Sequence, residues 1–134
     1  MKKIFIAFLL LIFSHFSIAQ KLKYGIFASC QGYVKTGKLI DSPKQFFIDA
    51  ILDKNTFMFE NSKKYTLYNK KEKVNGFNTT ISYDAIDETN QRCNIYFYQD
   101  NTKQSSLKNI ILIVYENSEI GYYFNSREPE KIKY

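Results

Sequence analysis

Apolar and polar residues alternate along most of the chain, and the alternation is clearest between residues 77 and 99. Phe77, Ile81 and Tyr83 fall on one face of an extended segment, while Asn78 and Ser82 fall on the other. Side chains of a strand alternate between the two faces of a sheet, so this pattern predicts half-buried β-strands. No segment after residue 20 has a strong apolar stripe of helical period.

Eight segments of this kind are separated by short polar turns. They cover residues 24–34, 46–52, 56–60, 64–69, 77–85, 92–99, 107–115 and 120–125. Regularly spaced short strands are typical of an antiparallel meander, which closes into a barrel or folds into a sandwich. We therefore predict an all-β protein, a single antiparallel β-barrel or β-sandwich of about eight strands.

Alternation alone does not assign three segments of the chain. Residues 44–52 leave an alternative open, because Ser42-Pro43 is also a suitable start for a short helix. Residues 70–76 carry several charges and are expected to form a loop. Residues 126–134 are expected to be a charged tail that frays.

The first 19 residues have a different pattern. Lys2 and Lys3 precede an apolar run from Ile4 to Phe13, and Ser17 and Ala19 then form a small-x-small cleavage site. This order is typical of a secretory signal peptide, and cleavage would leave Gln20 as the new N-terminus. We therefore expect a signal peptide at 1–19, a β domain at 20–125 and the tail at 126–134. The domain is expected to be exported to the periplasm or outside a bacterial cell, with no stable membrane insertion after cleavage.

The charge of the chain does not favour a nucleic-acid partner. The full chain has a net charge of +6, and removal of Lys2 and Lys3 lowers it by two, to +4. Its only arginines are Arg92 and Arg127, whereas phosphate and base recognition usually relies on that residue. We expect the protein to bind no nucleic acid.

The single histidine limits the available chemistry. His15 lies within the predicted signal peptide, so the mature domain lacks the base of Ser-His-Asp and Cys-His mechanisms and the imidazole of most zinc sites. We predict a protein that is not an enzyme and that has no metal or other cofactor. The pairs Asp49 with Asp53 and Glu116 with Glu119 keep a carboxylate-dependent hydrolase as the weakest hypothesis.

Two cysteines remain in the predicted domain, Cys30 and Cys93. An even number of cysteines in an exported chain favours a disulfide. We predict a Cys30–Cys93 bridge between the first strand and a late one. Two buried free thiols are the alternative.

Two charged clusters have a structural and a functional interpretation. Residues 84–90 contain three carboxylates and could form a calcium loop, but they lack its glycine and its spacing, so a solvated hairpin tip is favoured. A lysine cluster could bind an anionic partner, although lysines also protect sheet edges from aggregation. Its members are Lys63, Lys64, Lys70, Lys71 and Lys73.

Tyrosines provide the best functional candidates. Tyr96 and Tyr98 share a strand face, and Tyr83 and Tyr122 lie on other predicted strands. Exposed tyrosines form a platform for a glycan or a protein, whereas tyrosines inside a barrel line a pocket. Cross-strand packing is the structural alternative.

These observations lead to a functional expectation. We expect an exported, non-catalytic binding domain that holds a small apolar ligand, a glycan or a protein through an aromatic sheet face or a barrel mouth. The alternative is a structural or inhibitory cell-envelope protein that acts by surface contact without a pocket.

Overall fold

The fold is seen in a computed structural model, which describes residues 21–60, 63–100 and 109–132. The predicted signal peptide lies outside the described residues. Within the described ranges the chain forms strands and turns and no helix. The strands are β1 (Lys21–Tyr33), β2 (Lys44–Leu52), β3 (Thr56–Phe59), β4 (Lys64–Asn75), β5 (Asn78–Asp87), β6 (Arg92–Asp100), β7 (Asn109–Tyr115), β8 (Ile120–Ser126) and β9 (Glu130–Ile132).

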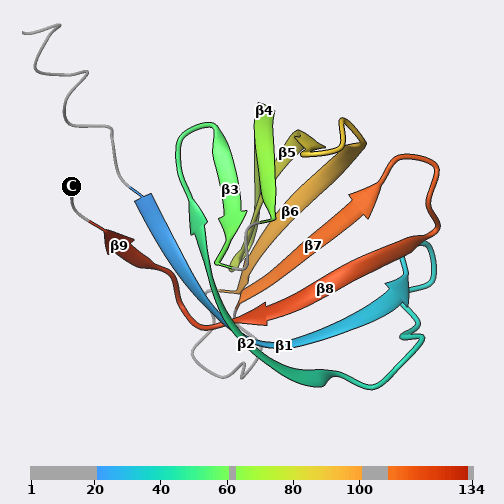
Figure 1. The fold of residues 1–134 in the computed structure, drawn as a ribbon. Coiled ribbons are helices and arrows are strands. Elements are labelled where there is room, and N and C mark those ends of the chain that lie inside the picture. Colours follow the sequence, from blue (N-terminus) through green and yellow to red (C-terminus); the bar gives the residue numbers. More distant parts are fainter. Residues whose placement is uncertain (1–20, 61–62, 101–108, 133–134) are drawn as a thin grey trace, which may run out of the picture.

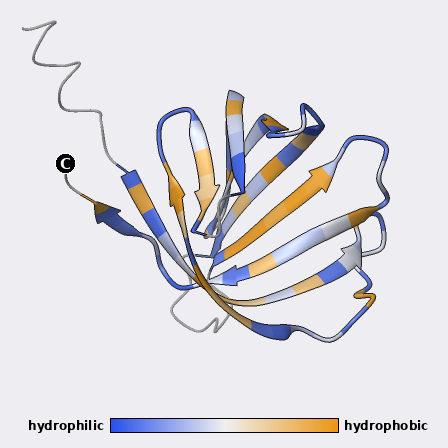
Figure 2. Cartoon of the chain, viewed as in Figure 1, coloured by the Kyte–Doolittle hydropathy of each residue, from blue (hydrophilic) through white to orange (hydrophobic). Residues whose placement is uncertain are grey.

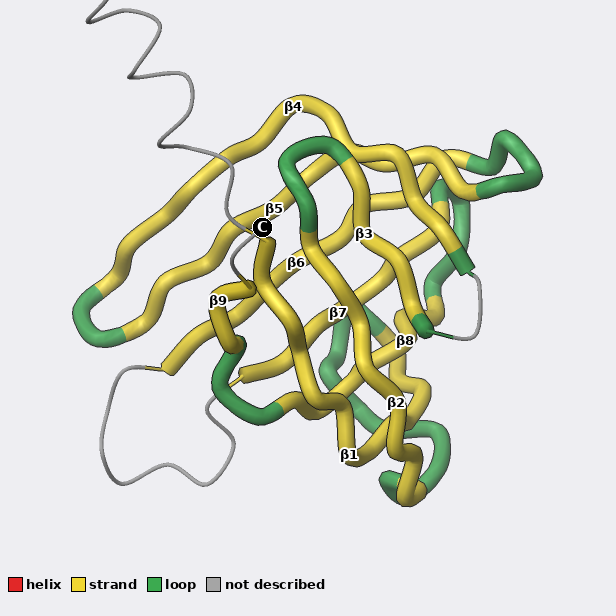
Figure 3. Tube along the Cα trace, turned by 60° about the vertical axis from the view of Figure 1, so that its left-hand side comes forward, coloured by secondary structure: helices red, strands yellow, loops and turns green. Residues whose placement is uncertain are grey.

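The first eight strands form a closed barrel (Figures 1 and 3). Each strand pairs antiparallel with the next, and β8 pairs with β1 to close the ring. The all-β prediction is confirmed, and the structure decides for an up-and-down barrel over a sandwich. Residues 44–52 form a strand, so the helical alternative is wrong.

An irregularity in β1 changes which side chains face inward. The pairing of β1 with both neighbours shifts between Ile26 and Ala28. Tyr24 and Ile26 are therefore buried in the core, whereas Cys30 pairs with Tyr123 on the outer wall. A bulge of one residue reverses the faces of every residue that follows it.

Aromatic rings fill the middle of the barrel. Phe57 is fully buried and its ring contacts those of Phe97, Phe59, Tyr65 and Tyr24, at centroid distances from 5.1 to 6.5 Å. Edge-to-face contacts predominate here, and such pairs add to the stabilisation from burial alone. Because this cluster occupies the centre, open space remains only towards the two ends.

The outer wall carries a second, smaller apolar layer. Strand β7 is hydrophobic along nearly its whole length (Figure 2), and its outward-facing Leu112 is as buried as the core. A Cβ atom on Gly121 would lie 2.6 Å from Leu112 Cδ1 and 3.2 Å from Val34. The absence of a side chain at Gly121 thus lets Leu112 and the segment after β1 pack closely on the wall.

The predicted loop at 70–76 and the predicted frayed tail at 126–134 are both wrong in part. Strand β4 continues to Asn75, and a two-residue turn with Gly76 at φ 61° joins it to β5, so most of the expected loop at 70–76 is strand. A positive φ suits a glycine at the first central position of such a hairpin. The tail contains β9, which pairs with the first residues of β1.

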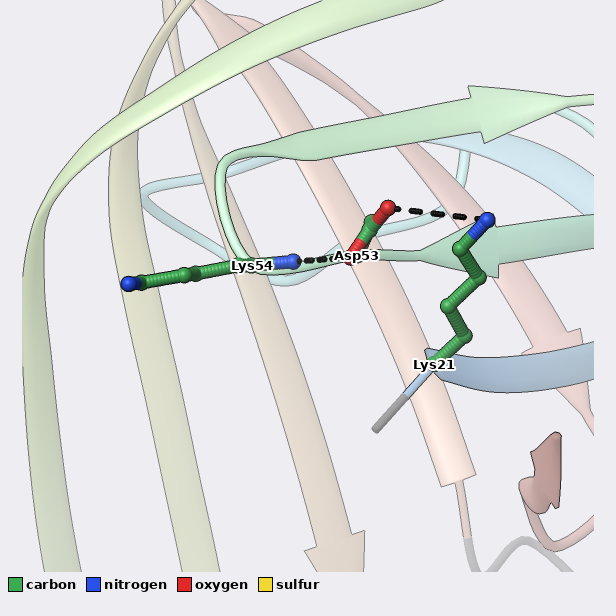
Figure 4. A network of polar contacts seen from close by, with 3 residues as sticks. All are labelled: Lys21, Asp53 and Lys54. Atoms are coloured by element: carbon green, nitrogen blue, oxygen red, sulfur yellow. Dashed lines mark hydrogen bonds and ion pairs between the residues drawn. The ribbon is translucent and has the colours of Figure 1, made fainter. Parts of the chain in front are cut away.

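Polar contacts also hold the start of β1 (Figure 4). Lys21 Nζ lies 3.7 Å from Asp53 Oδ2, and Asp53 Oδ1 accepts a hydrogen bond from the backbone N–H of Lys54 at 2.8 Å. This ion pair links the first strand to the β2–β3 turn at one end of the barrel. Since it is part-exposed, it contributes little to stability by itself.

Candidate functional site

An aromatic cavity opens at the end of the barrel that carries the β3–β4, β5–β6 and β7–β8 turns. We call it the mouth cavity, and its volume is about 210 Å³. It lies beyond the central aromatic cluster, so its floor is formed by the core. Its lining residues are Phe46, Phe59, Lys63, Tyr65, Ile113, Tyr115, Tyr122 and Phe124.

Three tyrosines give the mouth cavity its polar edge. The hydroxyl groups of Tyr65 and Tyr115 lie 3.4 Å apart, and the Tyr115 hydroxyl donates a hydrogen bond to Asp87 Oδ2 at 3.0 Å. The ring of Tyr122 stands perpendicular to that of Tyr115, with centroids 6.4 Å apart. The cavity therefore combines apolar walls with a few oriented polar groups, as small-molecule sites do.

Asp87 is held in place by its own turn. Its Oδ1 accepts hydrogen bonds from the N–H and the hydroxyl of Thr89, at 2.9 and 2.8 Å, and from the N–H of Gln91 at 3.0 Å. Desolvation opposes ionisation of this carboxyl, but the hydrogen bonds from Thr89, Gln91 and Tyr115 outweigh it and lower the pKa of Asp87. Asp87 is thus a fixed anion beside Tyr115.

The tyrosines beside it are held in the neutral form. Burial raises the pKa of Tyr115, and its contacts with Tyr65 and Asp87 raise it further. Burial also raises the pKa of Tyr65. Both hydroxyl groups therefore keep their protons at neutral pH and act as hydrogen-bonding groups without charge.

The mouth cavity opens outward into a more polar depression. This depression has a volume of about 490 Å³ and shares Lys63, Tyr65, Tyr115 and Tyr122 with the cavity. Its rim carries charges of both signs, because Lys63, Lys64, Asp87 and Glu88 line it. Glu88 also accepts a hydrogen bond from the backbone N–H of Lys64 on the neighbouring strand β4 at 2.8 Å. A ligand would enter past this mixed rim before it reached the aromatic walls.

The four tyrosines predicted as binding residues occupy three separate places. Tyr122 lines the mouth cavity. Tyr83 is buried in the core and lines a cavity of about 500 Å³ at the opposite end, where Asp53 and Lys70 contribute charges. Tyr96 and Tyr98 face outward on β6, with parallel rings 6.0 Å apart.

The sequence reasoning missed most of the mouth cavity. Tyr65 and Tyr115 lie on predicted strands, but nothing in their spacing, 50 residues apart, indicates that their hydroxyl groups meet. Phe46 and Phe59 also lie on predicted strands, and no pattern relates them to these tyrosines. Only the closed ring of strands brings these four side chains to one end.

The predicted Cys30–Cys93 disulfide is wrong, because both cysteines are free thiols. Cys93 is buried on the inner side of β6, whereas Cys30 is only partly buried and lies on the outer wall. Strands β7 and β8 lie between β6 and β1. The bulge in β1 explains the error, since without it Cys30 would face inward with Tyr24.

The charged clusters serve local structure. In the acidic turn, Asp84 accepts hydrogen bonds from Asn69 and Asn94 at 3.0 and 2.7 Å, and Asp87 caps its own turn. Among the described residues, no group of three or more Cys, Asp or Glu side chains is arranged to hold a metal ion. Asp49 pairs with Lys23 on the outer surface, and Asp53 pairs with Lys21 at the end of the barrel. In the lysine cluster, Lys63 and Lys64 lie on the rim of the depression, and the other three lysines lie further along β4.

The fold and the mouth cavity define a class, the small up-and-down β-barrels with an aromatic cavity at one end. No family model matches the chain, and neither a curated protein nor a solved structure matches it. Within the described ranges, no helix is long and apolar enough to cross a membrane.

Proposed function

We propose that this protein is an exported, non-catalytic binding domain that holds a small apolar ligand in the mouth cavity. The observation that supports this proposal is the cavity itself. Its walls are mainly phenyl and phenol rings, its volume is about 210 Å³, and it opens to solvent through a polar rim. Apolar walls of this kind favour a ligand over ordered water.

The volume limits the size of the ligand. An apolar cavity of about 150 Å³ is large enough for benzene, and sites for drug-sized molecules start at about 300 Å³. The mouth cavity lies between these values, so it suits one ring with a few further atoms, or a short branched chain. The depression outside it can accommodate a polar extension.

The outer wall offers less support for contact with a glycan or a protein. Tyr96 and Tyr98 stack on each other. Leu112 pairs with Tyr96 on one side and with Tyr123 on the other, and it is already buried. The stack therefore behaves as part of the wall. The mouth cavity is the better candidate because its lining is mainly aromatic, whereas the depression of about 430 Å³ beside Tyr98 is lined mainly by polar side chains.

The test uses toluene as a probe and two isoleucine methyl groups on β7 as reporters. Ile113 lines the mouth cavity, whereas Ile110 lies on the outward face of the same strand. Toluene is expected to shift the NMR signal of the Ile113 methyl group in a saturable manner and to leave that of Ile110 in place. Equal shifts of both signals, or no shift of Ile113 up to the solubility limit, would contradict the proposal.

A matched pair of variants locates the binding site. Phe124→Trp enlarges a ring of the cavity wall and is expected to weaken toluene binding by at least about tenfold. Phe47→Trp makes the same change at a ring that is 71% exposed on the outer side of β2, and it is expected to bind toluene like the wild type. The chain has no tryptophan of its own, so the new fluorophore also reports whether each variant is folded.

A further inference from the structure

The hydrogen bonds at the mouth cavity run in one direction, which Asp87 determines. Its ionised carboxylate has no proton to donate, so Tyr115 must donate across the 3.0 Å contact to Oδ2. A phenol has a single proton, so Tyr115 can only accept in its 3.4 Å contact with Tyr65. The Tyr65 hydroxyl therefore donates its hydrogen bond to Tyr115, and the Tyr115 hydroxyl donates its own to Asp87.

This direction leaves Tyr65 as an acceptor. Its only proton is engaged with Tyr115, and its oxygen retains lone pairs at the edge of the mouth cavity and of the depression outside it. Among the described residues, no other group bonds to this hydroxyl. A ligand that presents an O–H or N–H group gains a hydrogen bond here, whereas a ligand that only accepts sets its lone pairs against those of Tyr65.

The charges around the site favour a neutral ligand. A carboxylate would be attracted by Lys63 and Lys64 on the rim, but within the cavity it would lose its water and bring its oxygens towards the Tyr65 oxygen. An ammonium group would be attracted by Asp87 and Glu88 on the rim, but it would lose its water among aromatic rings that offer only neutral hydroxyl groups. Removing an unpaired charge from water is far more costly than burying a neutral polar group that finds a partner.

We infer that the mouth cavity selects a neutral apolar molecule that carries one hydroxyl or N–H donor, and that Tyr65 is the acceptor that recognises this group. The inference rests on the proposed function, because it assigns a ligand chemistry to the same cavity. Alcohols, phenols and indole-like ring compounds share this chemistry.

The experiment compares four probes built on one ring: toluene, 4-methylphenol, 4-methylanisole and 4-methylbenzoate. The phenol offers a donor, the anisole has a methyl group in its place, and the benzoate offers a charge. Dissociation constants come from the Ile113 methyl shift. A neutral hydrogen bond makes the phenol bind about three- to tenfold more tightly than the anisole. The benzoate is expected to bind more weakly than either.

Two variants separate the hydrogen bond from the size of the probe. Tyr65→Phe removes the acceptor, so the affinity ratio of phenol to anisole is expected to fall to about one. Tyr115→Phe removes the acceptor of the Tyr65 proton, which then turns towards the ligand, so the anisole gains relative to the phenol. A preference that depended on size alone would persist in Tyr115→Phe. Tyr98→Phe loses a hydroxyl on the outer wall and is expected to keep the wild-type ratio.

The outcomes distinguish the inference from the proposed function. If toluene binds and the phenol shows no advantage over the anisole, the donor inference is overturned and the cavity function stands. If no probe shifts Ile113, the proposed function itself fails. If the ratio persists in a folded Tyr65→Phe, another group recognises the donor. Should Tyr65→Phe not fold, the ratio in Tyr115→Phe decides.

Discussion

Two pairs of tyrosines on opposite sides of one wall illustrate how this barrel uses the same residue differently. Tyr65 and Tyr115 come from β4 and β7, point inward and bring their hydroxyl groups to 3.4 Å. Tyr96 and Tyr98 are two residues apart on β6, point outward and place their rings parallel, 6.0 Å apart. The inner pair meets through its polar atoms and the outer pair through its rings.

The difference follows from what surrounds each pair. Inside the barrel, rings from several strands already supply the apolar contacts, and a buried hydroxyl group must find a polar partner. On the outer wall water satisfies the hydroxyl groups, so the rings need only cover neighbouring apolar side chains such as Leu112. Substitutions on the two surfaces are therefore expected to differ in the size of their effects.

The largest effect is expected for phenylalanines on the two surfaces. Phe57→Ala leaves a hole in the central aromatic cluster and is expected to lower the free energy of unfolding by about 3–5 kcal/mol. Phe47→Ala removes an exposed ring and is expected to change it by less than about 0.5 kcal/mol. Urea unfolding measures both. Similar losses for the two variants would contradict the assignment of Phe57 to the core and of Phe47 to the outer surface.

The next contrast is between the two thiols. Burial and, to a smaller extent, the Asp87 charge raise the pKa of Cys93 to about 12. Burial and Asp41 also raise the pKa of Cys30, but this thiol is only partly buried. With iodoacetamide at pH 8, Cys30 is expected to react at least about a hundredfold faster, because Cys93 reacts only when the barrel opens. Mass spectrometry of Cys30→Ser and Cys93→Ser assigns the two rates. Faster labelling of Cys93, or a native protein without free thiols, would refute the assignment.

A smaller effect is expected for glycine on the outer wall. Gly121→Ala sets a Cβ atom 2.6 Å from Leu112 Cδ1, so Leu112 must move out of a packed position. Overpacking of this kind is expected to cost about 1–3 kcal/mol of stability. Gly25→Ala is the control, since its new Cβ would meet no atom closer than 3.7 Å. Equal stability of the two variants in urea would indicate that the outer layer is loosely packed.

The smallest effect concerns pH and Asp87. Hydrogen bonds from Thr89, Gln91 and Tyr115 outweigh desolvation and hold the folded pKa of Asp87 below its unfolded value of about 3.9. The folded state therefore binds this proton less readily than the unfolded chain. Its stabilisation is complete well above the unfolded pKa and is lost as the pH falls through the folded pKa.

The measurement is the urea midpoint of wild type and Asp87→Asn at pH 7 and at successively lower pH. The wild type is expected to be the more stable at pH 7, and the difference is expected to shrink below about pH 4. A difference that stays constant or grows on acidification would mean that the charge of Asp87 does not stabilise the fold.

Much of the fold could be predicted because strand periodicity is a local property. The alternation at Phe77–Ala85 and Arg92–Gln99 reproduces strands β5 and β6 closely. The strand predictions failed where pairing with a segment distant in the sequence determines the structure. The charges at 70–76 suggested a loop, but pairing with β5 extends β4 to Asn75. The tail gained a strand only because the start of β1 offered it a free edge.

The candidate site was harder to predict because it depends on register. Of the four tyrosines predicted as binding residues, Tyr122 lines the mouth cavity, whereas Tyr83, Tyr96 and Tyr98 lie elsewhere. Which tyrosines meet depends on strand order and stagger around a closed ring. These quantities are set by all the strand pairs together.

The amino-acid sequence by itself determined that the chain forms short antiparallel strands, and it places tyrosines and phenylalanines on both faces of them. Only the tertiary structure decided which of those rings enclose space, which thiol is buried and which hydroxyl groups meet at the mouth. The physical reason is that alternation depends on neighbours two residues away. A single bulge, such as that between Ile26 and Ala28, and the closure of β8 onto β1 exchange inside for outside without any local signal.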